Sequence, residues 1–167
     1  MDSAGNLQIA DVMMAKRRIQ DYARVTPLIR AEGLEKLFGG AEVWLKLENL
    51  QHTGSFKVRG VANKMLSMTE EERKRGVTAA SSGNHAQAVS YMARMLGTKA
   101  VIVMPENAPK TKVAGAKGYG AEVVLCGFTG EDRDRKCEEP DPGLRILSGA
   151  FPHRIPDRHC RTWDGGC

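Results

Sequence analysis

The sequence has no long hydrophobic run. Among its 167 residues, no apolar stretch approaches the roughly 18 residues that a membrane-spanning helix requires. The first residues, Met1 to Asn6, contain neither the basic nor the apolar segment of a secretory signal peptide. These absences predict a soluble protein without a membrane partner, and the cytoplasm is its expected location.

Closely spaced cysteine pairs are also missing. The chain has four cysteines, Cys126, Cys137, Cys160 and Cys167. None of them shows C-x-x-C spacing, which argues against both a zinc site and a disulfide framework. Cys126 ends an apolar run and is expected to be a buried thiol. The sequence therefore predicts no metal site.

Aromatic residues make up only 5% of the chain, and this affects how its net charge of +5 is interpreted. The basic runs are short. The run in residues 70–75 places acidic residues before basic ones, as the dipole of a helix favours. Because no aromatic residues are interleaved with the basic ones, the charge is typical of solvated helices, and we expect no nucleic-acid partner.

Short apolar runs alternate with segments of helical periodicity. Strands separated by single helices, each rich in apolar residues, imply right-handed βαβ crossovers and a parallel sheet. Thr69 and Glu72 form a capping box, and Met92 and Met95 are expected on the apolar core face of their helix. The sequence thus predicts an α/β fold with helices at 9–22, 32–38, 57–66, 70–75, 86–96 and 110–117, and strands or extended segments at 26–29, 43–47, 77–80, 100–104 and 121–125.

A lysine lies at the start of the third predicted helix, in the sequence Gly54-Ser55-Phe56-Lys57. Ser55 is a suitable N-cap for this helix and places Lys57 in its first turn. The positive end of the helix dipole disfavours the protonated amine there and favours its attack on an aldehyde, as in a Schiff base. The alternative interpretation is an ordinary solvated lysine.

A small polar loop, Ser81-Ser82-Gly83-Asn84-His85, lies between a predicted strand and the next helix. The backbone N–H groups of such a loop and the helix N-terminus after it converge on a carboxylate or a phosphate. The loop therefore indicates an anion-binding site. The alternative is an ordinary helix cap in a tight turn.

The lysine and loop motifs, in this order, resemble the tryptophan synthase β type (fold type II) of pyridoxal-phosphate enzymes. Within that class, the chain is similar to the threonine/serine dehydratase and serine racemase group. Residues 26–28 (TPL), 45–60 (LKLENLQHTGSFKVRG) and 81–87 (SSGNHAQ) carry the resemblance. Val58-Arg59 after the lysine is typical of dehydratases, whereas the cysteine and threonine synthases favour Asp-Arg.

This resemblance covers about residues 9–139. It implies that residues 53–137 form the small α/β domain of such an enzyme and that residues 1–52 belong to its large domain. The implied cofactor is pyridoxal 5'-phosphate, and the implied partner is a small hydroxy amino acid, threonine or serine. Relatives of this group are homo-oligomers.

The resemblance also implies a role for each motif residue. Lys57 would bind the cofactor aldehyde and later take the Cα proton of the substrate. Phe56 would pack beside the cofactor ring, and Asn84 would hydrogen-bond the ring hydroxyl. The implied reaction is that of an ammonia-lyase, in which loss of the β-hydroxyl gives a 2-oxo acid and ammonia. The substrate carboxylate would lie on the loop Ser81, Ser82, Gly83, Asn84 and His85.

Ser82 leaves a second reaction open. Racemisation requires an acid on the face opposite Lys57, and serine racemases carry a serine where this chain has Ser82, a position at which many dehydratases have alanine. The other interpretation of Ser82 is a hydroxyl that only caps the loop. His85 is expected to orient the loop rather than act as a base. A third hypothesis for the whole chain is a non-catalytic α/β fragment that binds an anionic metabolite.

The helical pattern stops after Glu139, and residues 138–167 are predicted to form an aberrant, disordered tail. Read one nucleotide out of frame, the codons of residues 158–166 permit a string similar to the Ile-Ala-Gly-Gln-Gly-Thr segment of dehydratases. We therefore expect a frameshift near Pro140. Since relatives need roughly 300 residues, the size of two domains, this chain is expected to be truncated and inactive as written.

Overall fold

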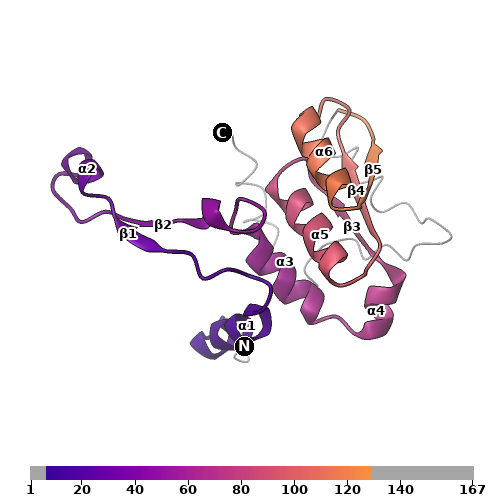
Figure 1. Cartoon of the computed structure of the whole chain (residues 1–167), viewed down its shortest axis with the longest axis horizontal. Coiled ribbons are helices and arrows are strands. Elements are labelled where there is room, and N and C mark those ends of the chain that lie inside the picture. The colour runs from indigo at the N-terminus through magenta and orange to yellow at the C-terminus, as the bar shows by residue number, and fades with distance from the viewer. Residues whose placement is uncertain (1–6, 129–167) are drawn as a thin grey trace.

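A parallel sheet of three strands forms the centre of the fold in residues 7–128, the part of the chain that the computed structural model describes. One helix follows each of the first two strands (Figure 1). The predicted α/β fold with a parallel sheet and βαβ connections is therefore confirmed. In chain order, the elements are β3 (Val77–Ala80), α5 (Asn84–Met95), β4 (Ala100–Met104), α6 (Lys110–Gly118) and β5 (Glu122–Leu125).

The sheet has the order β3-β4-β5, with Val77 opposite Ala100 and Val101 opposite Glu122. Because the strands are parallel, the loops that follow β3 and β4 leave the sheet at the same edge. That edge is where ligands bind in open α/β sheets. The predicted loop 81–85 begins there.

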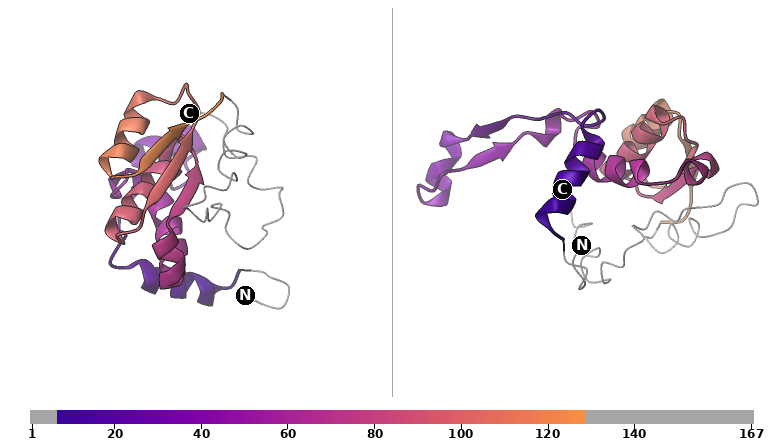
Figure 2. Two further views of the ribbon diagram at one scale, coloured as in Figure 1. Left: turned by 90° about the vertical axis from the view of Figure 1, so that its right-hand side faces the viewer. Right: turned by 90° about the horizontal axis from the view of Figure 1, so that it is seen from below.

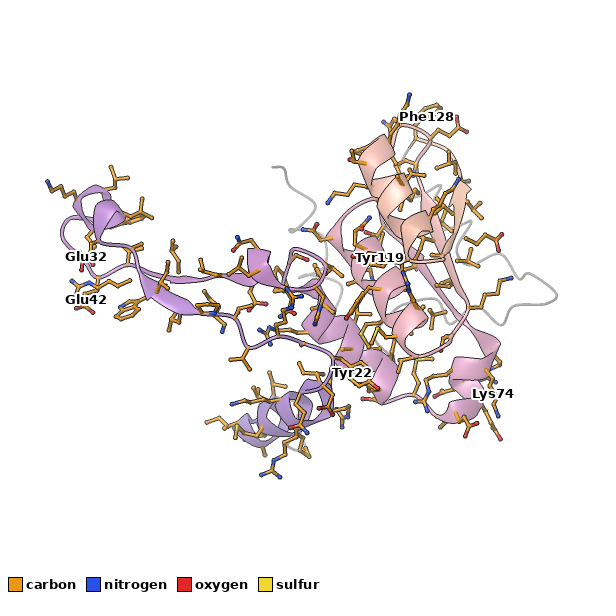
Figure 3. The ribbon with its side chains drawn as sticks, viewed as in Figure 1. Tyr22, Glu32, Glu42, Lys74, Tyr119 and Phe128 are labelled. Atoms are coloured by element: carbon orange, nitrogen blue, oxygen red, sulfur yellow. The ribbon has the colours of Figure 1, made fainter. Side chains whose placement is uncertain are left out.

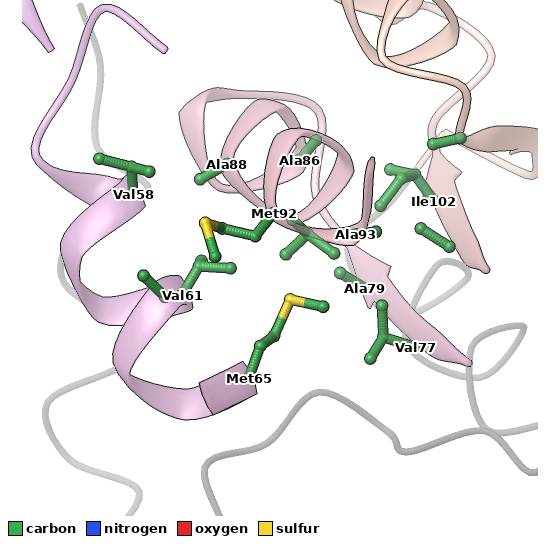
Figure 4. Close-up of a cluster of buried hydrophobic side chains, with 14 of the residues drawn as sticks. Val58, Val61, Met65, Val77, Ala79, Ala86, Ala88, Met92, Ala93 and Ile102 are labelled. Carbon is green, nitrogen blue, oxygen red and sulfur yellow. The ribbon is translucent and has the colours of Figure 1, made fainter. Parts of the chain in front are cut away.

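The core lies between α3 (Lys57–Leu66), α5 and the sheet (Figure 4). Val58, Val61 and Met65 of α3 are at most 5% exposed and face α5. Met92 of α5 is completely buried among them, as the sequence predicted. The helix that carries the lysine is thus fixed by apolar packing against the helix that follows the polar loop.

The prediction that Met95 is a core residue is wrong, because this side chain is 49% exposed. The buried stripe at this end of α5 consists of Val89, Met92 and Ala93, which are three or four residues apart, and it continues into the partly buried Leu96 just after the helix. Met95 lies beside that stripe and faces away from the core.

Both ends of α4 and the end of α5 follow the predicted local signals. In α4 (Glu70–Arg75), the N–H of Glu72 donates to Thr69 Oγ1 at 3.2 Å, and the N–H of Thr69 donates to Glu72 Oε2 at 2.8 Å. This is the predicted capping box. Gly76 and Gly97 follow α4 and α5 with φ of +94° and +62°, values that a residue with a side chain rarely adopts.

The N-terminal part of the chain forms an arm, residues 28–46, that projects from the helix and sheet body (Figures 1 and 2). Its strands β1 (Leu28–Arg30) and β2 (Trp44–Lys46) pair antiparallel in a sheet of their own. The sequence predicted extended segments at 26–29 and 43–47 but did not predict that they pair with each other. Between them lie only a four-residue helix, α2 (Glu32–Glu35), and the 3₁₀ turn η1 (Lys36–Phe38). This connection is too short to cover a sheet face.

Side chains project from both faces of the arm (Figure 3), and the apolar ones among them are exposed. Ile29 and Leu45 lie opposite each other and are 43% and 39% exposed, and Trp44 on the other face is 52% exposed. The arm starts after α1 (Ile9–Ile19), which ends earlier than the predicted 9–22. That residues 1–52 belong to a larger domain stays a prediction.

Cys126 is half-buried rather than buried, because it follows the edge strand β5. Within residues 7–128, no helix is long and apolar enough to span a membrane. The predictions for residues 138–167, including the disordered tail and the frameshift, lie outside the described residues.

Candidate functional site

Lys57 is the first residue of α3, directly after the turn formed by residues 51–56. Gly54 makes this turn possible, because its φ of +70° lies in the left-handed region that favours glycine. The N–H of Gly54 donates to the carbonyl of Gln51 at 2.9 Å and closes the turn. Lys57 is half-buried at a helix N-terminus, as the sequence predicted.

Ser55 does not cap this helix, so that part of the prediction is wrong. The N-cap is Phe56, whose backbone is already helical, with φ −62° and ψ −15°. Ser55 is 6% exposed, and neither its hydroxyl nor that of Thr53 has a hydrogen-bond partner in residues 7–128. Because buried hydroxyls are almost always hydrogen-bonded, this turn offers two unused polar groups just before the lysine.

Phe56 lies against the amine of Lys57. The Nζ atom is 5.3 Å from the centre of the Phe56 ring, which is within the range of a cation–π contact. Phe56 is also 49% exposed, so the ring is accessible beside the amine. A flat ligand that reacts with the lysine therefore has an aromatic surface next to it.

The polar loop continues β3 and begins α5. The N–H of Ser81 donates to the carbonyl of Val103 at 3.0 Å, and the N–H of Gly83 donates to Ser81 Oγ at 3.3 Å. Helix α5 begins at Asn84, two residues before the predicted start, with Gly83 as an N-cap that makes no side-chain bond. The first N–H groups of α5 therefore have no partner in their own helix and carry the positive end of its dipole.

Ser82 is half-buried, and its hydroxyl makes no hydrogen bond within the described part of the chain. The interpretation of Ser82 as a loop cap is therefore wrong, because Ser81 accepts the local hydrogen bond and Gly83 is the N-cap. The Ser82 hydroxyl is left available for a ligand. Whether it acts as an acid stays a prediction.

His85 of the polar loop is close enough to Lys57 to feel the charge of its amine. Burial lowers the pKa of His85, and the nearby positive charge of Lys57 lowers this pKa further. The imidazole is therefore neutral at pH 7. A neutral side chain beside the amine fits the predicted orienting role better than that of a second cation.

Asn84 is exposed in the first turn of α5 and contacts the next helix. Lys112 Nζ donates to Asn84 Oδ1 at 3.1 Å, and Gln87 Nε2 donates to the carbonyl of Lys112 at 2.8 Å. Sequence reasoning missed Lys112. One signal was present, because a cation in the first turn of a helix is disfavoured by the helix dipole and needs a compensating contact.

A second group that sequence reasoning missed connects α3 to the segments just before and just after the arm. Arg59 Nε donates to Glu48 Oε2 and Arg59 Nη2 donates to Glu48 Oε1, both at 2.8 Å. Arg59 Nη2 also donates to the carbonyl of Arg24 at 2.9 Å. The Arg59 hydrogen bonds lower the pKa of Glu48 to about 2. This network fixes the residues on both sides of Lys57.

His52, which gave no signal in the sequence, stacks on Tyr91 with ring centres 5.2 Å apart. Tyr119 meets Tyr91 edge to face at 5.6 Å. Burial lowers the pKa of His52, and the charge of Arg24 lowers this pKa further. The cluster packs the turn before Lys57 against α5. Within residues 7–128, no three His, Cys, Asp or Glu residues are placed to hold a metal ion.

Comparison with known proteins identifies the family to which the chain belongs. Residues 19–147 match the family described as pyridoxal-phosphate dependent enzyme, so the chain belongs to that family. The chain is 46% identical over 127 residues to the catabolic L-threonine dehydratase TdcB of Staphylococcus aureus (strain USA300). This alignment covers 76% of the chain but 37% of that protein, so the chain spans little more than a third of the curated relatives it matches.

Two solved structures show the same relationship. A serine racemase from Dictyostelium discoideum is 38% identical with a TM-score of 0.76, over 85% of this chain and 47% of that one. A threonine deaminase from T.th. is 45% identical with a TM-score of 0.69, over 78% of this chain and 40% of that one. The predicted resemblance to the dehydratase and racemase group is confirmed, as is the predicted cofactor of the family.

The described residues fit pyridoxal phosphate. Lys57 supplies an amine for its aldehyde, and Phe56 supplies an accessible aromatic face beside that amine. The unpaired hydroxyls of Thr53 and Ser55 and the amide of Asn84 supply polar groups around them. All five residues come from two segments, the turn leading into α3 and the start of α5, and these two helices pack against each other (Figure 4).

Proposed function

We propose that this chain carries the lysine and the substrate-carboxylate loop of a pyridoxal-phosphate-dependent threonine/serine dehydratase, an ammonia-lyase. One observation carries the proposal: Lys57 lies against the Phe56 ring at the start of α3, and α3 packs on α5, the helix that begins in the polar loop (Figure 4). The 46% identity to a threonine dehydratase supports threonine as a substrate, and serine is the smaller homologue of threonine.

The mechanism assigns a task to each group. Pyridoxal phosphate, when bound, supplies the electron sink for bond breaking at the substrate Cα. The free N–H groups at the start of α5 bind the substrate carboxylate, which the helix dipole also stabilises. This contact orients the Cα–H bond toward Lys57 Nζ, which accepts the proton. The β-hydroxyl leaves as water, and hydrolysis by a second water then gives the 2-oxo acid and ammonia.

A racemase is the second candidate, because the Ser82 hydroxyl is free and the chain is 38% identical to a serine racemase. An acid at Ser82 would return a proton to the face opposite Lys57. With L-serine as substrate, Ser82→Ala separates the two reactions. The dehydratase proposal expects pyruvate formation to survive this change. If D-serine forms in the wild type and disappears in the variant, the racemase is favoured instead.

We also propose that residues 53–137 form a unit that folds without residues 1–52, and that the protein is a cytoplasmic homo-oligomer. The support for the unit is that α3, α5, α6 and the sheet contribute most of the core, to which the described part of residues 1–52 adds the buried side chains of Ile19 and Ala23. Limited proteolysis should cleave after about residue 139 and leave this unit intact. Rapid cleavage within residues 86–125 would rule it out.

The proposed cofactor link is tested by trapping. The chain is incubated with pyridoxal phosphate, reduced with borohydride to make a lysine–cofactor link permanent, digested and examined by mass spectrometry. We expect the modification on the peptide that contains Lys57, with none on that peptide in Lys57→Ala. Lys64→Ala, a change in the same helix, should leave the signal unaltered. Equal labelling of many lysines would contradict the proposal.

A further inference from the structure

We propose that Lys112 is a positioning residue that fixes the orientation of the Asn84 side-chain amide. This inference rests on the proposed function, in which Asn84 hydrogen-bonds the ring hydroxyl of pyridoxal phosphate. Its basis is the 3.1 Å contact between Lys112 Nζ and Asn84 Oδ1. The two residues belong to the first turns of α6 and α5, the helices that follow β4 and β3.

The chemistry of the two groups determines which end of the amide faces the lysine. An ammonium group has three donors and no acceptor, whereas a side-chain amide has an acceptor oxygen and an NH₂ group with two donors. At 3.1 Å, the lysine can only be met by the amide oxygen. Asn84 Nδ2 is then on the opposite side of the amide and keeps both N–H donors for a ligand.

This orientation suits one form of the cofactor. When its ring hydroxyl ionises, the oxygen becomes an anion, which an N–H donor stabilises and an amide oxygen would repel. Donation from a charged ammonium to Oδ1 also polarises the amide and strengthens its N–H donors. Lys112 therefore favours the ionised hydroxyl without touching the cofactor, and it acts through Asn84.

Lys112 is itself held in place by α5. Gln87 Nε2 donates to the carbonyl of Lys112 at 2.8 Å. Gly115 allows this approach, because a Cβ at that position would lie 2.5 Å from Gln87 Oε1. No carboxylate pairs with Lys112 in the described part of the chain, so Asn84 Oδ1 is the acceptor that its ammonium uses.

The contact is tested first without cofactor. The side-chain amide resonances of Asn84 are assigned by ¹⁵N NMR in the wild type, in Lys112→Met and in Lys110→Met. The two variants each remove one charge from the same helical turn. We expect the Asn84 amide signals to shift in Lys112→Met and to stay in place in Lys110→Met, with the backbone spectrum otherwise preserved. Unchanged Asn84 signals in both variants would overturn the inference.

The consequence is tested with pyridoxal phosphate. The ionised ring hydroxyl gives a longer-wavelength absorbance band than the neutral one, so the ratio of the two bands reports its state. We expect Lys112→Met to lower this ratio by roughly two- to tenfold, the factor that one hydrogen bond of ordinary net strength contributes. Lys112→Arg, which keeps a cationic donor, should restore most of it, and Lys110→Met should have no effect.

The outcomes separate the two proposals. A Lys57-dependent band whose ratio is the same in Lys112→Met and the wild type would overturn the positioning role and leave the proposed function standing. If no Lys57-dependent band forms in the wild type, the proposed function fails, and the NMR comparison alone decides whether Lys112 orients Asn84.

Discussion

Arg59 and Glu48 form a two-point ion pair, in which Nε and Nη2 of the arginine each lie 2.8 Å from a different oxygen of the carboxylate. The pair joins the first turn of α3 to the 3₁₀ turn η2 (Glu48–Leu50) that precedes it. Thr26 Oγ1 donates to the same carboxylate at 2.5 Å, so the segment just before the arm is bonded to this pair as well. Lys57 lies between the two paired residues in the chain, so the pair ties together the ends of the segment that contains it.

Removal of the arginine should destabilise the fold. We expect Arg59→Ala to lower the free energy of unfolding by about 1.5–3 kcal/mol, because it leaves a mostly buried carboxylate without its charged donor. Glu48 is 17% exposed in this pair. Urea denaturation followed by circular dichroism measures the change. Arg17→Ala, an exposed arginine on α1, serves as the control, and an equal effect of both variants would contradict this role.

The same pair should make stability depend on pH. The pKa of Glu48 falls from 4.5 to about 2 in the folded chain, so folding favours the ionised carboxylate. Its contribution is fully present above pH 4.5 and is lost as the pH falls toward 2. We expect the free energy of unfolding to decline through this window in the wild type and to decline less in Glu48→Gln. Parallel curves for the two proteins would show that another group is responsible.

Two methionines of α5 offer a matched test of the core. Met92 is completely buried between α3 and the sheet, whereas Met95 is 49% exposed. Truncation of a buried methionine leaves a cavity and costs about 2–5 kcal/mol, so Met92→Ala should lower thermal stability strongly. Met95→Ala should change the free energy of unfolding by less than about 0.5 kcal/mol. Similar melting temperatures for both variants would contradict the observed packing.

The arm should promote self-association. Leu37 and Phe38 at its far end are 77% and 62% exposed, and exposed apolar surface of this kind favours contacts between molecules. We expect the joint change Leu37→Ser and Phe38→Ser to reduce concentration-dependent aggregation, measured by light scattering, while the melting temperature stays the same. If aggregation is unaffected, another surface is responsible.

The 167-residue chain by itself should have little dehydratase activity. Residues 7–128 include the Lys57 amine, the Phe56 ring beside it and the polar loop, but the chain spans 37% of the dehydratase it matches. The assay adds saturating pyridoxal phosphate and L-threonine and follows 2-oxobutanoate, with Lys57→Ala as the background. Turnover on the order of 10 per second, ordinary for an enzyme, would show that the described groups suffice.

Local signals predicted most of the body of the fold. The bounds of Lys57–Leu66 and Ala100–Met104 agree with the prediction, because apolar periodicity and flanking glycine or proline mark them in the sequence. The capping box of Thr69 was equally readable. The antiparallel pairing of β1 with β2 could not be read from the sequence, since it depends on contacts between strands that no hairpin turn signal connects.

Sequence reasoning located those candidate site residues that belong to one short motif. Their positions could be predicted because Lys57 begins a helix just after the turn with Gly54, and the loop 81–85 contains Gly83 immediately before the start of α5. The acceptor for Lys112 could not be predicted from the sequence. Asn84 is 28 residues away, and only the packing of α6 on α5 brings the two side chains together. Ser55 was misplaced because the choice of N-cap depends on backbone angles, which a sequence does not specify.

The spatial order β3-β4-β5 repeats the order of these strands along the chain, and this has a consequence for folding kinetics. Each strand joins the edge of a sheet that earlier residues have already formed, so loop closures stay short and no strand must wait for a distant partner. The sheet can therefore grow strand by strand during synthesis on the ribosome. The arm is made before the sheet, and its apolar ribbon emerges while the rest of the chain is still unfolded.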